Sequence, residues 1–185
     1  HPEKTFNRIT TIEQREKLLD SVGVDVVRIV TPTKEFLHQT PEEFIKEVVE
    51  TSSPSVIVEG DAFRFGKDRE GNIETLQGLG RQFDFSCLAL PAVEVTLRDH
   101  SIVQASSSMV RWLIGEGRVE DASIMLGRPY SISGRVEQGD KRGRTLGIHT
   151  ANLGEIQTMM PKEGIYAGTA FIGDQSYAAA ISIGT

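Results

Sequence analysis

The chain has 185 residues, of which 38% are hydrophobic and 25% charged, and its formal net charge is -6. This length fits one large domain or two small ones, and the composition argues against disorder. An acidic chain lacks the basic surface that general binding of nucleic acid requires, so we expect no nucleic-acid partner. No apolar run approaches the roughly 18 residues that span a bilayer, and no signal peptide is visible, so we expect a cytoplasmic protein without a membrane partner.

The first two thirds of the chain alternate between predicted helices and strands. A capping box formed by Thr11 and Gln14 predicts a helix over Ile12–Ser21, and the run Thr-Pro-Glu-Glu at residues 40–43 predicts the start of another. Hydrophobic patterning predicts strands at residues 24–30, 55–59 and 83–90, and a short helix at 72–79. Strands that alternate with helices indicate parallel β-α-β units, and hence an α/β domain.

The last third has a different pattern. A hairpin is predicted at residues 92–105, and it is followed by helices over Ser107–Gly115 and Val119–Leu126. After Gly127 the helical periodicity vanishes, and Gly-rich turns separate short strands predicted at 131–136, 165–172 and 177–183. We therefore predict an α/β domain of residues 1–126, followed by an all-β domain of residues 127–185 that is cut short.

Residues 60–67 are the first segment with a composition suited to ligand binding. They directly follow a predicted strand, and ligands of open parallel sheets bind beyond the carboxyl ends of strands. Gly60 permits close approach, Arg64 could contact phosphate, and Phe63 and Phe65 could stack on a flat ring. The alternative is a plain surface loop whose two Phe side chains pack into the core, and composition alone favours it.

Residues 106–111 (Ser-Ser-Ser-Met-Val-Arg) form the second such segment. The hydroxyls of Ser107 and Ser108 would lie at a helix N-terminus, with Arg111 about one turn further on, and together they could hold a triphosphate. The alternative is ordinary N-capping with a solvated Arg111, which the frequency of serine at helix starts favours.

The third segment is a loop that combines glycines with cations: Gly139, Lys141, Arg142, Gly143, Arg144 and Gly147. Backbone N–H groups of such a loop can bind phosphate oxygens. Thr150 and Asn152 follow, and in an extended segment residues two apart present their oxygens to the same side, where they suit Mg²⁺. A solvated basic hairpin loop is an equally good interpretation of these residues alone.

These segments occur in one order, and that order resembles the prokaryotic bifunctional riboflavin kinase/FMN adenylyltransferases, or FAD synthetases. Residues 60–66 resemble the family's Gly-x-Asp/Asn-Phe-Arg-Phe-Gly loop, and residues 106–111 its Ser-Ser-Thr-x-Ile-Arg motif. Residues 139–152 resemble its Gly-Asp-x-Arg-Gly-x-x-Leu-Gly-Phe-Pro-Thr-Ala-Asn signature. Shorter matches occur at residues 1–3, 36–48, 126–130 and 164–168. The resemblance implies a nucleotidyltransferase-like α/β domain with a Rossmann-like parallel sheet, followed by a truncated flavokinase barrel.

The resemblance also implies the chemistry, which is two transfers from ATP. Riboflavin would be phosphorylated to FMN, and FMN would then be adenylylated to FAD. Thr150 and Asn152 would bind Mg²⁺, while no catalytic residue is identified with certainty within the chain. The residues implied for nucleotide and phosphate are Ser107, Ser108, Arg111, Gly139, Lys141, Arg142, Gly143, Gly147, Thr150 and Asn152. Those implied for the flavin or nucleotide are Gly60, Asp61, Phe63, Arg64 and Phe65.

The chain departs from the family pattern at several positions. Ala62 stands where the family has Asp or Asn, Met109 where a basic residue is frequent, and His149 where the family has Pro. The family's His-x-Gly-His signature would precede His1, and its Asn-Pro-Thr segment and the glutamate that acts as the kinase base would follow Thr185. We therefore expect further sequence at both ends and poor activity of this piece alone.

Two other functions are compatible with the same segments. The chain could be a non-catalytic module that binds flavin or nucleotide. The basic loop could instead bind RNA, although it lacks the aromatic platform of such modules.

Overall fold

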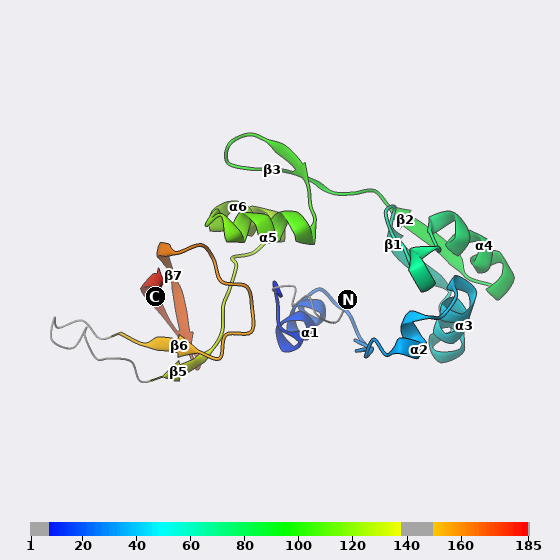
Figure 1. The fold of residues 1–185 in the computed structure, drawn as a ribbon, viewed down its shortest axis with the longest axis horizontal. Coiled ribbons are helices and arrows are strands. Elements are labelled where there is room, and N and C mark those ends of the chain that lie inside the picture. The colour runs from blue at the N-terminus through cyan, green and yellow to red at the C-terminus, as the bar shows by residue number, and fades with distance from the viewer. Residues whose placement is uncertain (1–7, 138–149, 185) are drawn as a thin grey trace. The chain divides into compact units, whose positions relative to one another are not determined.

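The computed structural model describes residues 8–137 and 150–184 (Figure 1). The chain divides into two compact units, one formed by Val26–Val93 and the other by His1–Asp25 together with Glu94–Thr185. Each unit has its own cluster of buried hydrophobic side chains.

The unit Val26–Val93 contains a parallel β-α-β element, as the sequence predicts. Its elements are α2 (Lys34–Leu37), α3 (Pro41–Ser52), β1 (Val56–Gly60), the 3-10 turn η1 (Lys67–Arg69), α4 (Ile73–Phe83) and β2 (Ser86–Leu90). Strands β1 and β2 pair in parallel from Val56 opposite Ser86 to Gly60 opposite Leu90. The carboxyl ends of both strands therefore lie at the same edge.

Helix α3 begins where the sequence predicts it. The Thr40 hydroxyl accepts the Glu43 N–H at 3.2 Å, and the Glu43 carboxylate accepts the Thr40 N–H at 2.8 Å. This reciprocal pair satisfies two N–H groups that a helix start leaves without partners. Ile45 on the same helix is only 2% exposed and packs in the core of the unit with Leu76 of α4.

Within the unit Val26–Val93, the described residues cover one face of the β1–β2 pair. Ile57 and Cys87 pack against the core, whereas four apolar side chains of the other face remain about half exposed: Val56, Val58, Leu88 and Leu90. The core therefore lies between one face of the strands and the helices.

The strand predicted at residues 24–30 is wrong. The structure gives these residues no strand, and Val26 is 81% exposed. A run of β-branched residues forms a strand only when its backbone finds a ladder partner, and the described part of the chain offers it none. The sequence did not predict helix α2, whose N-cap is Thr33; the Thr33 hydroxyl accepts the Phe36 N–H at 3.2 Å.

The second unit joins helices to three antiparallel strand pairs. Its elements are α1 (Ile12–Ser21), β3 (Glu94–Thr96), β4 (Ile102–Gln104), α5 (Ser107–Gly115), α6 (Val119–Leu126), β5 (Arg135–Glu137), β6 (Asn152–Gly154), β7 (Gly164–Ile172) and β8 (Gln175–Ile183). The pairs are β3–β4, β5–β6 and β7–β8. Helices α1, α5 and α6 have the predicted bounds, and Leu113 and Ile114 of α5 are fully buried.

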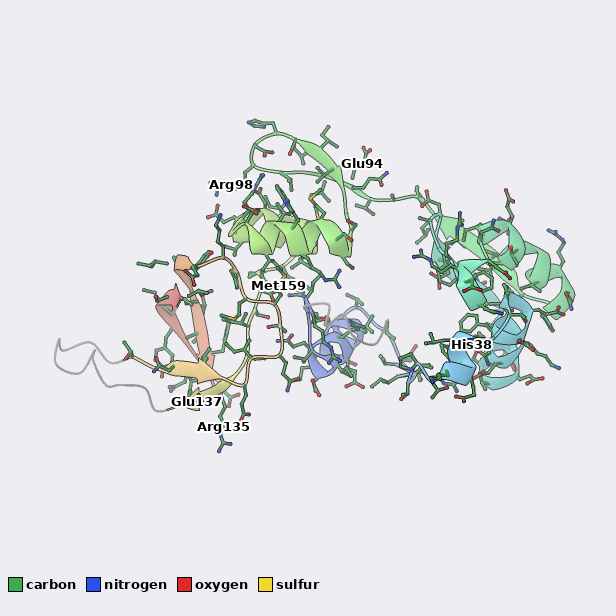
Figure 2. All side chains as sticks on the ribbon, in the orientation of Figure 1. His38, Glu94, Arg98, Arg135, Glu137 and Met159 are labelled. Carbon is green, nitrogen blue, oxygen red and sulfur yellow. The ribbon has the colours of Figure 1, made fainter. Side chains whose placement is uncertain are left out.

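The segment between β6 and β7 packs against the end of α5. The Lys162 N–H donates to the Ile114 carbonyl at 3.2 Å, and the Tyr130 hydroxyl donates to the Met159 carbonyl at 2.5 Å. The Met159 N–H in turn donates to the Arg8 carbonyl at 2.8 Å; Met159 is labelled in Figure 2. Residues on both sides of position 126 thus share one compact unit. Within the described residues, no helix is long and apolar enough to cross a membrane.

Candidate functional site

The loop after β1 is fixed at the carboxyl ends of both parallel strands. The Asp61 N–H donates to the Leu90 carbonyl at 2.9 Å, so the start of the loop is held by the end of β2. Phe65 and Gly71 exchange two backbone hydrogen bonds, of 3.1 and 2.9 Å, which close the loop. The loop therefore lies at the edge where open parallel sheets bind ligands.

The aromatic side chains of this loop face the core. Phe65 is 6% exposed and stacks on Phe63, with ring centroids 5.3 Å apart, while the Phe44 ring lies 5.9 Å away. Gly66 has a φ of +72°, and a Cβ there would lie within 2.8 Å of the Pro41 ring, so no other residue fits without rearrangement. The core packing that the sequence left as an alternative is thus what the structure shows for Phe65.

The polar part of the loop is open to solvent. Asp61 and Arg64 are exposed, and no other atom lies within 4 Å of the position that a Cβ on Gly60 would take. Just before the loop, burial raises the pKa of the Glu59 carboxyl, which is half-buried in β1. A ligand could meet one carboxylate, one guanidinium and exposed backbone here.

The three serines at the start of α5 have two different roles. The Ser106 hydroxyl accepts the Met109 N–H at 3.2 Å and is the N-cap, so the capping alternative holds for this residue. Ser107 and Ser108 lie in the first turn with exposed side chains, and Arg111 is half-buried one turn further on. A helix start with exposed hydroxyls and free N–H groups is suited to an anion.

An ionic network that the sequence did not reveal holds α6 against the β3–β4 turn. Arg118 donates from Nε to Asp121 Oδ2 at 2.7 Å and from Nη2 to Asp99 Oδ2 at 2.8 Å, and the Arg98 N–H donates to Asp121 Oδ1 at 2.9 Å. The Arg118 guanidinium also lies 5.8 Å from the centre of the Trp112 ring on α5. Sequence spacing could suggest only the Arg118–Asp121 pair, because the other partners come from a distant turn.

The carboxylates of this network have lowered pKa values. Hydrogen bonds from the Ser101 hydroxyl and N–H, followed by that from Arg118, lower the pKa of Asp99 to about 2. Burial by itself would raise the pKa of Asp121, but the Arg98 N–H and the Arg118 guanidinium outweigh it and lower the pKa. The network therefore stabilises the ionised form of both carboxylates.

Of the third predicted binding segment, residues 139–152, the structure describes residues 150–152, which lie at the start of β6. Asn152 is the first residue of β6, lies directly opposite Glu137 of β5, and is exposed; Thr150 is exposed two residues earlier. Oxygen donors of this kind fit the preferences of Mg²⁺. The other predicted residues of this segment lie outside the described residues: Gly139, Lys141, Arg142, Gly143 and Gly147.

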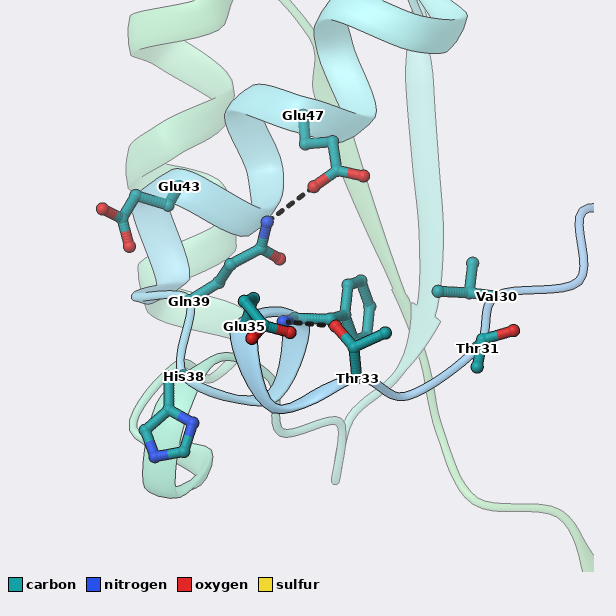
Figure 3. A pocket seen from close by; sticks show the side chains of 9 residues that line it. Val30, Thr31, Thr33, Glu35, His38, Gln39, Glu43 and Glu47 are labelled. Atoms are coloured by element: carbon teal, nitrogen blue, oxygen red, sulfur yellow. Dashed lines mark hydrogen bonds between the residues drawn. The ribbon is translucent and has the colours of Figure 1, made fainter.

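An open cavity of about 670 Å³ lies elsewhere, in the unit Val26–Val93 (Figure 3). Its lining residues are Val30, Thr31, Thr33, Glu35, Phe36, His38, Gln39, Glu43 and Glu47. None of the predicted site residues lines it, and its three carboxylates would repel a nucleotide polyphosphate. We therefore do not place the chemistry in this cavity.

Comparisons with known proteins agree on one family. The sequence model of FAD synthetase matches residues 1–105, and that of riboflavin kinase matches residues 126–185. Proteins named bifunctional riboflavin kinase/FMN adenylyltransferase are similar to the chain. The one from Buchnera aphidicola subsp. Schizaphis graminum is 35% identical over 161 residues, which cover 86% of this chain and 50% of that protein. The one from Escherichia coli (strain K12) is 31% identical and covers 99% of this chain and 58% of its own length.

A solved structure is also similar over the whole chain. The crystal structure of a protein named macrolide-efflux protein, from Streptococcus pneumoniae, has a TM-score of 0.87 and 32% sequence identity, and the match covers 100% of this chain and 58% of that one. The chain spans about half the length of the relatives it matches. The first match covers more than half of the chain, and the riboflavin kinase match follows it in order, so the chain belongs to the FAD synthetase family.

Proposed function

We propose that the chain is part of an enzyme that phosphorylates riboflavin to FMN and then adenylylates FMN to FAD, with ATP as the donor in both steps. The observation that carries this proposal is the order of the two family matches, at residues 1–105 and 126–185 of one chain. The relatives named as bifunctional enzymes show the same pairing in their names.

The proposed domains follow the same order. Residues 1–126 form a nucleotidyltransferase-like domain with a Rossmann-like sheet, and residues 127–185 form the first part of a flavokinase barrel. The parallel β1–α4–β2 element supports the first domain, and the antiparallel pairs β5–β6 and β7–β8 support the second. The start of the second family match, at residue 126, supports a boundary near that residue.

The adenylyl transfer is assigned to the first domain. An oxygen of the FMN phosphate attacks the α-phosphorus of ATP, the bond to the β-phosphate breaks, and pyrophosphate leaves. Ser107, Ser108 and Arg111 hold phosphate oxygens at the start of α5, where the helix dipole favours negative charge. Asp61 and Arg64, exposed on the loop after β1, contact the flavin or nucleotide, while Phe65 holds that loop from within the core.

The kinase step is assigned to the second domain. The ribityl 5′-hydroxyl oxygen bonds to the γ-phosphorus of ATP, its proton passes to a base, and ADP leaves. Thr150 and Asn152 would hold Mg²⁺ and phosphate, and the loop of residues 139–147 would supply cations and backbone N–H groups. Mg²⁺ bound there would supply positive charge to the phosphate oxygens as their charge develops. Neither step requires a covalent intermediate on the protein, so positioning and electrostatics are its contributions.

A direct assay tests the proposal. The protein encoded by the complete gene is incubated with riboflavin, ATP and Mg²⁺, and FMN and FAD are separated by chromatography over time. We expect FMN to appear first and FAD to follow, and we expect the 185-residue chain alone to give much less of both. Absence of both products from the complete protein would overturn the proposal. Tight calorimetric binding of FMN or ATP without turnover would instead support a non-catalytic binding module.

A further inference from the structure

The register of the β5–β6 pair places an acidic residue beside the proposed metal-binding residues. Glu137 and Asn152 are direct cross-strand partners, so their side chains lie on the same face of the pair. Cβ atoms of such partners are about 5 Å apart, a separation that two side chains can bridge through one ion bound at roughly 2.1 Å. The sequence alone could not show this, because 14 residues lie between Glu137 and Asn152 in the chain.

The Glu137 carboxylate is available for a ligand. Glu137 is exposed, and within the described residues it has no hydrogen bond or ion pair. Its carboxyl group lies over Gly154, in space that any side chain at that position would take; Glu137 is labelled in Figure 2. From there, rotation about the side-chain bonds of an exposed Glu brings the carboxylate over Asn152.

We propose that Glu137 is a third oxygen ligand of the divalent cation held by Thr150 and Asn152, either directly or through a water molecule. This inference rests on the proposed kinase site. A hydroxyl and an amide are neutral, so by themselves they bind a bare divalent cation weakly. A carboxylate adds a full negative charge at the same face, and Mg²⁺ sites in proteins are usually built on one or two carboxylates together with substrate phosphates.

A carboxylate ligand at Glu137 would set the order in which the cation and the nucleotide bind. With Glu137 in place, the cation binds to the protein before the nucleotide and then meets the phosphates there. Without it, the cation arrives only as a complex with the nucleotide. Arg135 shares the face of Glu137, being two residues away on the same strand, yet the structure gives no ion pair between them, so the carboxylate is not neutralised by this neighbour.

The test measures cation binding without nucleotide. Mn²⁺, which also prefers oxygen ligands, is titrated into the 185-residue chain, and free Mn²⁺ is followed by electron paramagnetic resonance. We expect the unchanged chain to bind one Mn²⁺, and Glu137→Gln to weaken that binding by roughly tenfold or more. Glu137→Asp should keep part of the affinity. Glu163→Gln is the matched control, because Glu163 is an exposed carboxylate just before β7, and it should bind as the unchanged chain does.

Two results would overturn the inference, and they differ in what they say of the kinase site. If Asn152→Ala lowers Mn²⁺ affinity and Glu137→Gln leaves it unchanged, Glu137 is not a ligand but the proposed site stands. If the chain binds no Mn²⁺, or neither variant alters the binding, both the inference and the metal assignment of Thr150 and Asn152 fail. Circular dichroism and Trp112 fluorescence of each variant establish that it remains folded.

Discussion

The loop after β1 and the start of α5 are both proposed to contact nucleotide or flavin, yet they are held in different ways. The loop is anchored by Phe65, which is 6% exposed, so the shape of the ligand-facing surface depends on a core side chain. At α5, Ser106 caps the helix while Ser107 and Ser108 remain exposed. In both places the residue that stabilises the fold differs from the residues proposed to bind, but the loop is held by a core side chain and the helix start by a hydrogen bond within its first turn.

The largest expected effect is that of Phe65→Ala. Removing this ring from the core should lower the free energy of unfolding of the unit Val26–Val93 by about 3–5 kcal/mol. Trp112 is the single tryptophan of the chain and lies in the other unit, so its fluorescence reports on that unit alone. In urea, we expect the unfolding transition of Val26–Val93, followed by far-UV circular dichroism, to move to a lower urea concentration. The midpoint of the transition followed by Trp112 fluorescence should stay constant.

The control for this change is Arg64→Ala in the same loop. Arg64 is exposed, so its loss should alter stability by no more than about 0.5 kcal/mol. If Phe65→Ala shifts the midpoint of Trp112 fluorescence as much as that of circular dichroism, the two units unfold together. Phe65 would then stabilise both units and not only Val26–Val93.

Asp121→Asn should have the next largest effect, on the unit that contains α5. Asp121 is 5% exposed and accepts hydrogen bonds from Arg98 and Arg118. Loss of its charge should lower the free energy of unfolding by about 2 kcal/mol, a value reduced to allow for the partial exposure of Arg118. Urea unfolding followed by Trp112 fluorescence at pH 7 measures it. Val119→Ala on the same helix is a suitable control, because a Val side chain can neither donate nor accept a hydrogen bond in the network.

The same network predicts a pH dependence. The folded-state pKa values of Asp99 and Asp121 are lowered, that of Asp99 to about 2, whereas the unfolded value is about 3.9. Their contribution is therefore fully present above about pH 4 and is lost as the pH falls toward 2. Stability of the unchanged chain, followed by Trp112 fluorescence, should decrease over this range more steeply than that of Asp121→Asn. Parallel curves would show that the network does not stabilise the unit.

Ser106→Ala should have a smaller effect, confined to stability. The N-cap hydroxyl satisfies the Met109 N–H, and its loss should destabilise the unit by about 1 kcal/mol. Thermal unfolding followed by Trp112 fluorescence would detect this change. Ser106→Asp, which restores a capping oxygen, should recover most of the lost stability.

Ser108→Ala should have the smallest effect on stability and act on binding instead. The exposed hydroxyl contributes no more than about 0.5 kcal/mol to folding. Loss of one phosphate hydrogen bond should raise the KM for ATP in FAD formation by about fivefold, which corresponds to about 1 kcal/mol. Steady-state kinetics of the complete protein measure it, with the kinase step as internal control. An unchanged KM would remove Ser108 from the proposed site.

Local signals predicted much of the fold. The capping boxes at Thr11 and Thr40 located two helix starts to the residue, because a cap is a contact within one turn. Strand prediction at residues 24–30 failed because a strand depends on a distant ladder partner. The strand predicted at 83–90 began too early, because the sequence pattern did not show where the preceding helix ends. Helix α4 continues to Phe83 and ends only where Asp84 adopts a left-handed conformation.

The sequence predicted which segments make up the candidate site, but not which residues contact one another in the folded structure. Order and composition of the motifs located the loop after β1, the start of α5 and the strand at Asn152. The roles within each segment needed tertiary structure: Phe65 as a core residue, Glu137 as the neighbour of Asn152, and Asp99 as the partner of Arg118. Each of these depends on register or packing between residues that are distant in the sequence.

The contacts of the segment between β6 and β7 also have a consequence for how the protein could be divided. Lys162 satisfies the last-turn carbonyl of Ile114, and Met159 satisfies the hydroxyl of Tyr130. Severing the polypeptide after residue 126 would therefore remove one of the donors to the Ile114 carbonyl, which would keep the Gly117 N–H, and would uncover apolar surface on α5. Residues on the two sides of position 126 within this unit should therefore melt as one block, and Trp112 fluorescence should report a single thermal transition for both.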